Sequence, residues 1–94
     1  MTRQYLAGEL SLMLGQLEAT VSDPEGVREV ASLRHEAEAL PVCDLGSLVS
    51  RALALSDKIC LHSVESGSWA AFSFQTSICS ELWRFGVGAG LLAD

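Results

Sequence analysis

Residues 44–65 carry the sequence DLGSLVSRALALSDKICLHSVE, in which apolar side chains recur at alternating spacings of four and three residues. One row along this stretch consists of Leu48, Ala52, Leu55, Ile59 and His62. A second row beside the first consists of Val49, Leu53, Cys60 and Val64. This period is typical of an α-helix, and two adjacent rows make an apolar surface wide enough to contact two neighbours. We therefore predict a central helix over residues 45–65, capped at its start by the Asp44 carboxylate.

Two further helices are predicted before the central one. The first covers residues 3–20, where one helical face carries Leu6, Leu10, Met13 and Leu17. The second begins at the sequence SDPE of residues 22–25, which places a capping side chain, a proline and an acid at a helix start. It is predicted to run over residues 24–40. Pro41 ends it, because a proline disfavours helical angles in the residue before it.

A fourth helix is predicted over residues 69–85, which hold five of the six aromatic residues of the chain. Because this segment carries no charge before position 81, we expect it to bury more than one of its faces. Gly86 is the expected C-cap. The remaining residues 86–94 are expected to form either a flexible tail or an arm that packs Leu91 and Leu92 onto a neighbour.

The four predicted helices are joined by short connections, which make consecutive helices antiparallel. No segment shows the alternation expected of a β-strand. A chain of 94 residues is long enough for one hydrophobic core. We therefore predict an all-α, up-and-down antiparallel four-helix bundle that occupies residues 1–94 as a single domain.

Composition predicts that the bundle self-associates. Hydrophobic residues make up 49% of the chain, and only 6 basic and 12 acidic residues accompany them. That content is high for a domain of this size, so some apolar surface is expected to remain exposed after folding. Symmetric dimers are the commonest means of burying such a surplus in soluble proteins. A homodimer is therefore the expected assembly, with a different protein partner as the alternative.

The charge distribution excludes several classes of partner. The net charge of -6 and the scattered basic residues oppose contact with phosphate backbones, so we expect no nucleic-acid binding. The chain also lacks the clustered cations that dock proteins on anionic membranes, and it has no apolar run long enough for a membrane span or signal peptide. The three cysteines are widely spaced, as is typical of buried thiols in a reducing compartment. We expect a cytoplasmic protein.

Two kinds of candidate site follow from the helices. The aromatic side chains of the fourth helix are the best candidates for a subunit or partner interface, and they include Trp69, Phe72, Trp83 and Phe85. The alternative is a small-molecule-binding bundle with an apolar pocket between the third and fourth helices. In that interpretation His62 and Trp69 lie near the mouth of the pocket.

Motifs for catalysis and metal binding are missing from the sequence. Its cysteines and histidines are Cys43, Cys60, Cys79, His35 and His62. They form neither a C-x-x-C pair nor a His-x-x-x-His pair, so we expect no metal site and no cofactor. There is also no G-x-S-x-G elbow and no glycine-rich phosphate loop after a strand. These observations favour a non-catalytic interaction or regulatory module.

One short segment suggests a third function. Residues 28–36, REVASLRHE, resemble the phosphoacceptor helix of sensor histidine kinases, in which an exposed histidine precedes an acidic residue within a dimeric four-helix bundle. His35 and Glu36 match that pair, although Pro41 falls one place later than the proline usual in the family. The resemblance implies phosphotransfer through His35 as a remote alternative function.

Overall fold

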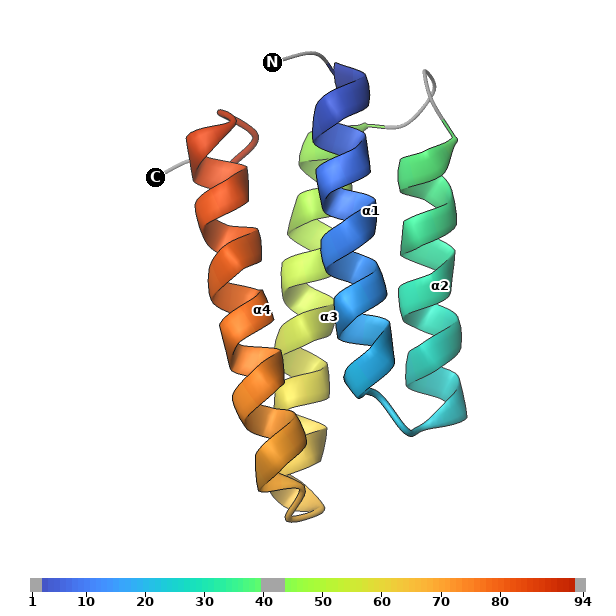
Figure 1. Ribbon diagram of the computed structural model, residues 1–94, viewed down its shortest axis with the longest axis vertical. Helices are drawn as coiled ribbons and strands as arrows, with labels where there is room; N and C mark the ends of the chain where they lie inside the picture. The colour runs from blue at the N-terminus through green and yellow to red at the C-terminus, as the bar shows by residue number, and fades with distance from the viewer. Residues whose placement is uncertain (1–2, 40–43, 93–94) are drawn as a thin grey trace.

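Four α-helices make up the fold in the computed structural model, which describes residues 3–39 and 44–92. They are α1 (Arg3–Thr20), α2 (Pro24–Glu38), α3 (Leu45–Glu65) and α4 (Trp69–Gly88). Each helix runs antiparallel to the next one along the chain (Figure 1). The described ranges contain no strand. The predicted all-α, up-and-down four-helix bundle is confirmed.

The helices are arranged as a flattened diamond. The most extensive packing is that of α1 on α2 and of α3 on α4, and α1 and α3 also contact each other. Within the described ranges α2 and α4 make no contact, and they lie at opposite edges of the bundle (Figure 1). The molecule measures 39 × 27 × 16 Å along its principal axes. Thus α1 and α3 each contact three helices, whereas the edge helices α2 and α4 each contact two.

The hydrophobic core draws side chains from all four helices. The largest apolar side chains that are completely or almost completely buried are Leu10, Leu14, Leu17, Val30, Leu48, Val49 and Leu82. Each contributes roughly 1.5–3 kcal/mol relative to an exposed side chain. The first row of the central helix is buried from Leu48 to Ile59, but its last member, His62, is exposed. The buried part of that row therefore ends at Ile59, well before the end of the helix at Glu65.

Aspartate side chains cap the starts of α2 and α3. The Asp23 Oδ2 atom accepts a hydrogen bond from the backbone N–H of Gly26 at 3.2 Å. In the same way, Asp44 Oδ1 accepts one from the N–H of Ser47 at 3.2 Å. These bonds satisfy amides that have no carbonyl partner within their own helix. The cap predicted at Asp44 is confirmed.

Glycine in the left-handed conformation ends both α3 and α4. Gly67 has φ of 76° and Gly90 has φ of 73°, values that a residue without a Cβ atom adopts easily. After α4, the N–H of Leu91 donates to the carbonyl of Gly86 at 2.8 Å, and the N–H of Gly90 donates to that of Val87 at 3.1 Å. This pair of bonds is a Schellman motif, and it turns the chain back toward the bundle.

The end of α4 differs from the sequence prediction. The helix continues three residues past position 85, to Gly88, and Ala89 rather than Gly86 is its C-cap. Gly86 is buried inside the helix, where a Cβ atom would lie 2.7 Å from Leu92 Cγ. Its missing side chain lets Leu91 and Leu92 fold back and pack against the core of their own chain. The tail predicted from position 86 therefore begins later, and residues 93–94 lie outside the described ranges.

The helix α2, in contrast, ends earlier than predicted. The helix stops at Glu38 and Ala39 is its C-cap. Residue 40 and Pro41, to which the predicted end was assigned, lie outside the described residues.

Ion pairs join α2 to α3 across the surface. Arg51 donates two hydrogen bonds to the carboxylate of Glu36, at 2.8 and 3.0 Å. About two turns away along each helix, Lys58 Nζ lies 3.1 and 3.4 Å from the two carboxylate oxygens of Glu29. Because water and salt screen these exposed groups, each pair contributes little to stability. Burial of apolar side chains, and not these ion pairs, therefore provides most of the stability of the α2–α3 contact.

We predict that Gly86→Ala lowers the free energy of unfolding by about 1–3 kcal/mol, because the added methyl group overpacks the contact with Leu92. The matched control is Gly15→Ala in α1, where a Cβ atom meets nothing within 4 Å. That change should raise the free energy of unfolding by up to about 1 kcal/mol through helix propensity alone. Urea denaturation followed by circular dichroism measures both. Equal stabilisation by the two substitutions would contradict the assigned role of Gly86.

A second prediction concerns the acid side of the stability curve. The hydrogen bonds from Arg51, together with its charge, hold the pKa of Glu36 below its ordinary value. A carboxyl group whose pKa is lower in the folded state stabilises the fold above its unfolded pKa, and that contribution disappears as the pH falls through its folded pKa. In Arg51→Gln, carbon-detected NMR titration should show the pKa of Glu36 returning upward to its ordinary value. An unchanged titration would show that Arg51 does not hold the carboxylate in solution.

Candidate functional site

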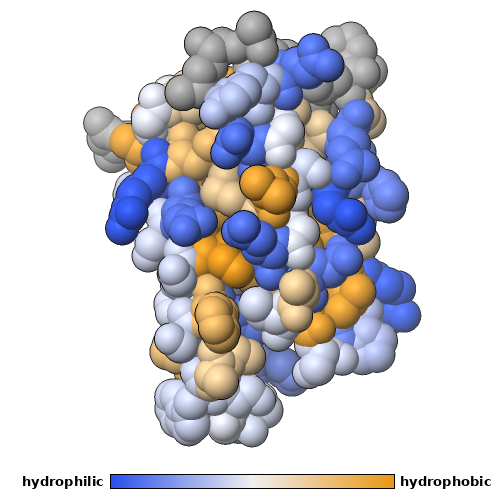
Figure 2. Space-filling view, in the orientation of Figure 1, coloured by the Kyte–Doolittle hydropathy of each residue, from blue (hydrophilic) through white to orange (hydrophobic). Residues whose placement is uncertain are grey.

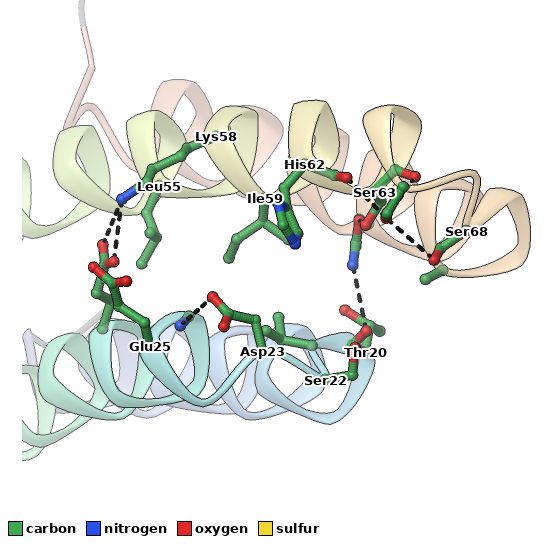
Figure 3. Close-up of a pocket in the computed structure, with 16 residues that line it drawn as sticks. Thr20, Ser22, Asp23, Glu25, Leu55, Lys58, Ile59, His62, Ser63 and Ser68 are labelled. Carbon is green, nitrogen blue, oxygen red and sulfur yellow. Dashed lines mark hydrogen bonds and ion pairs between the residues drawn. The ribbon is translucent and has the colours of Figure 1, made fainter.

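A pocket of about 390 Å³ opens at the end of the bundle where the α1–α2 turn faces the α3–α4 hairpin (Figure 3). Its walls come from the end of α1, the first turns of α2, the second half of α3 and the start of α4. The α3–α4 hairpin extends beyond the α1–α2 turn at this end of the molecule (Figure 1). The pocket lies in the resulting step.

The apolar part of the pocket comes from Leu55 and Ile59 of α3, with Val21 of the turn and Ala71 of α4. His62 extends from α3 toward the α1–α2 turn, and Asp23 extends from the turn toward α3 (Figure 3). A concave surface with an apolar floor and a few polar groups is the usual form of a small-molecule site.

Two sets of contacts hold opposite walls of the pocket in place. On one side Lys58 is paired with Glu29, and on the other Gln75 bridges two elements. The Gln75 Oε1 atom accepts a hydrogen bond from Ser63 Oγ at 2.7 Å, and Nε2 donates to the carbonyl of Thr20 at 3.3 Å. Gln75 is 1% exposed and Ser63 is 6% exposed. The bridge therefore ties α4 to α3 and to the end of α1 inside the bundle.

Gln75 was not among the candidates identified from the sequence. The available signal was its spacing, because Gln75, Ile78, Leu82 and Gly86 follow each other at intervals of three and four and form the buried face of α4. A glutamine in an otherwise apolar row indicates a buried polar group that needs partners. The identity of those partners depends on how the helices pack.

The structure separates the two residues that were predicted at the mouth of a pocket. His62 lines the pocket, whereas Trp69 is not among its lining residues and is 63% exposed. The pocket was also predicted between α3 and α4, but its lining includes α2 and the end of α1. The reason is that α3 and α4 pack closely on each other, so the open space lies beside that pair.

The aromatic residues proposed for an interface divide between two flanks of α4. Trp69 and Phe72 contact each other edge to face, with ring centroids 6.0 Å apart and an interplanar angle of 89°. Trp83 is 50% exposed on the same flank, eleven residues after Phe72. Phe85 lies on the opposite flank, where it is half-buried and packs against the core. Phe74, at 67% exposure, also lies on the flank opposite Trp83.

Cys60 and Cys79 are free thiols on the facing flanks of α3 and α4. Burial raises the pKa of Cys60, with smaller contributions from Cys79 and Asp57. A raised pKa keeps a thiol protonated and weakly nucleophilic at neutral pH. Cys43 lies outside the described residues. Among the residues that are described, no group of three histidine, cysteine or acidic side chains is placed to hold a metal ion.

His35 is exposed in the last turn of α2, and its Nδ1 atom lies 4.0 Å from Glu38. Its side chain is 75% exposed. Glu36, the acidic residue that follows it, is engaged by Arg51 of α3. The histidine therefore stands on the solvent side of an edge helix, far along α2 from the pocket at its first turns.

Comparison with models of protein families, with curated proteins and with solved structures found no match for this chain. None of the helices in the described ranges combines the length and the hydropathy needed to cross a membrane. The pocket and the exposed flank of α4 are the two surface features of the described residues that suggest a function.

The buried bridge leads to a stability prediction. Gln75→Leu leaves the Ser63 hydroxyl and the Thr20 carbonyl without their partner, and we expect it to lower the free energy of unfolding by about 1–3 kcal/mol. Adding Ser63→Ala to Gln75→Leu removes the stranded hydroxyl, so the double variant should lose less than the sum of the two single changes. Urea denaturation of the three variants measures this coupling. Strictly additive losses would show that the two side chains do not interact.

Proposed function

We propose that this chain is a non-catalytic cytoplasmic interaction or regulatory module that acts as a homodimer. The observation that supports the proposal is that two tryptophans, Trp69 and Trp83, are exposed on one flank of α4, with the partly buried Phe72 between them. Monomeric proteins seldom expose several aromatic side chains together, and such surfaces commonly serve as interfaces. The proposed interface is described by two adjoining rows.

One row of this interface lies on α4 and consists of Trp69, Phe72, Thr76, Cys79 and Trp83, spaced by three or four residues. The other row of the interface lies on α3 and consists of Leu53, Asp57, Cys60 and Val64, also spaced by three or four residues. Residues at these intervals share one side of a helix. The Cys79 thiol donates a hydrogen bond to Asp57 Oδ1 at 3.6 Å, which places the rows beside each other. We call this surface the α3–α4 strip.

The low charge of the α3–α4 strip is compatible with a second copy of the chain as its occupant. The chain carries a net charge of -6, so two copies repel each other over most of their surfaces. Within the strip the only charged residue is Asp57, whose carboxylate accepts the bond from Cys79. A nearly uncharged aromatic surface lets two acidic subunits meet with little repulsion, and a two-fold axis would place the same strip on both sides.

Figure 2 shows one face of the molecule, coloured by hydropathy. Apolar surface there is divided into patches by hydrophilic residues. Although Phe74 is strongly exposed, helical periodicity places it opposite Trp83 and therefore outside the strip. Phe74 is thus a suitable control for an interface that involves only one flank of α4.

We predict that Trp83→Glu weakens dimerisation by at least about 2 kcal/mol, because it removes a large aromatic side chain and places a carboxylate in the interface. Sedimentation equilibrium should give about twice the 10.0 kDa subunit mass for the unaltered chain and the subunit mass for Trp83→Glu. Circular dichroism should show equal helix content, because Trp83 is half exposed.

The matched control is Phe74→Glu, which makes the same kind of change on the other flank and should leave the dimer intact. If the unaltered chain sediments as a monomer at all concentrations, the proposed homodimer is wrong. If Trp83→Glu and Phe74→Glu dissociate equally, the interface does not lie on the α3–α4 strip.

A further inference from the structure

The pocket at the α1–α2 turn lies away from the α3–α4 strip and is not used by the proposed dimer. None of the residues that line it belongs to the strip. Its volume of about 390 Å³ lies within the range of small-molecule sites. Two buried polar side chains, Gln75 and Ser63, form part of its wall and are held by hydrogen bonds of their own. The cavity is therefore pre-formed in the folded chain.

The charged groups around the pocket are unequal in number. Three carboxylates line it, those of Asp23, Glu25 and Glu29, against the single ammonium group of Lys58. Lys58 is paired with Glu29, and within the described ranges neither Asp23 nor Glu25 forms an ion pair. The Asp23 carboxylate accepts one backbone hydrogen bond through Oδ2, and Glu25 forms no hydrogen bond or ion pair within the described ranges.

The helix ends around the pocket do not reverse this imbalance. The starts of α2 and α4 bring partial positive charge to the pocket, while the ends of α1 and α3 bring partial negative charge. These contributions oppose each other, so the side chains decide the sign of the potential. An anionic ligand would meet two uncompensated carboxylates in a chain that is already acidic, whereas a cationic ligand would neutralise them.

Asp23, Glu25 and His62 are not brought together as a metal-ligand group in the described structure, so the arrangement does not favour a metal ion as the ligand. The apolar floor formed by Leu55 and Ile59 would also be of no use to a bare ion. An apolar body with a charged end fits both parts of the pocket. From this geometry we infer that the pocket binds a small organic cation, a protonated amine on an apolar skeleton, with the ammonium group near Asp23 and Glu25.

In this arrangement the polar and apolar walls of the pocket bind different parts of the ligand. The ammonium group donates hydrogen bonds to the carboxylate oxygens of Asp23 and Glu25, and the apolar body covers Leu55 and Ile59. Asp23 keeps its bond to the N–H of Gly26 through Oδ2, so binding does not remove the cap of α2. His62 closes the side of the pocket opposite Asp23 (Figure 3). Charge-assisted hydrogen bonds of this kind are the strongest polar contacts available to the site.

The test is an NMR titration of the ¹⁵N-labelled chain with phenethylamine and hexylamine as probes. The matched neutral and anionic probes are phenethyl alcohol, hexanol and hexanoate. The amide signals of Gly26, Ile59 and Ser63 should shift and saturate with the amines. The alcohols should bind about tenfold more weakly, which is the loss expected when one charge-assisted contact is removed. Hexanoate should give no saturable shift.

Two variants locate the contact. Asp23→Asn combined with Glu25→Gln removes both charges while asparagine preserves the helix cap, and it should weaken amine binding about tenfold or more. Glu81→Gln is the control for removal of a carboxylate elsewhere on the surface. Glu81 is exposed on α4 and does not line the pocket, so this substitution should leave the affinity unchanged. Ala71→Leu narrows the pocket from the α4 side and should reduce binding of both amines.

Each remaining result would overturn the inference. Amines that produce no saturable shift would show that the pocket is not a site for organic cations. Alcohols that bind as tightly as amines would show an apolar site without charge recognition, and preferential binding of hexanoate would reverse the proposed sign. Equal weakening by Glu81→Gln and by the Asp23/Glu25 variant would show general attraction to an acidic protein.

Discussion

The rest of the structure depends on the central position of α1 and α3, the two helices that each contact all three others. These two helices touch across the short diagonal of the bundle, and each also packs on both of the others. With that diagonal closed, α2 and α4 remain apart at the edges. Each edge helix can bury only the side that faces the central pair. The exposed aromatic flank of α4 is a direct consequence of this arrangement.

Unequal helix lengths explain the pocket. α3 and α4 contain 21 and 20 residues, whereas α1 and α2 contain 18 and 15. At 1.5 Å per residue, the six extra residues of α3 relative to α2 correspond to about 9 Å of additional helix. The longer hairpin therefore projects beyond the shorter one at one end of the bundle (Figure 1). Side chains from both hairpins line the step, and the Gln75 bridge prevents its walls from closing or separating freely.

The two proposed sites differ in the charge of the residues that form them. The α3–α4 strip is almost free of charge, which suits contact between two copies of an acidic chain. The pocket carries an excess of carboxylates, which suits a cation. Because the strip and the pocket share no residue, occupation of one need not block the other.

The sequence alone determined the helices and their starting points, because those depend on interactions between near neighbours. The period of three and four in residues 45–65 specifies a helix wherever it is placed, and the carboxylates of Asp23 and Asp44 cap amides only three residues away. Only the tertiary structure decided which contacts distant residues make. Gly86 resembled a helix end in the sequence, but it is a buried contact for Leu92, and Gln75 finds partners in α1 and α3. Such pairings depend on the order in which the helices pack, and the local pattern along one helix does not contain that order.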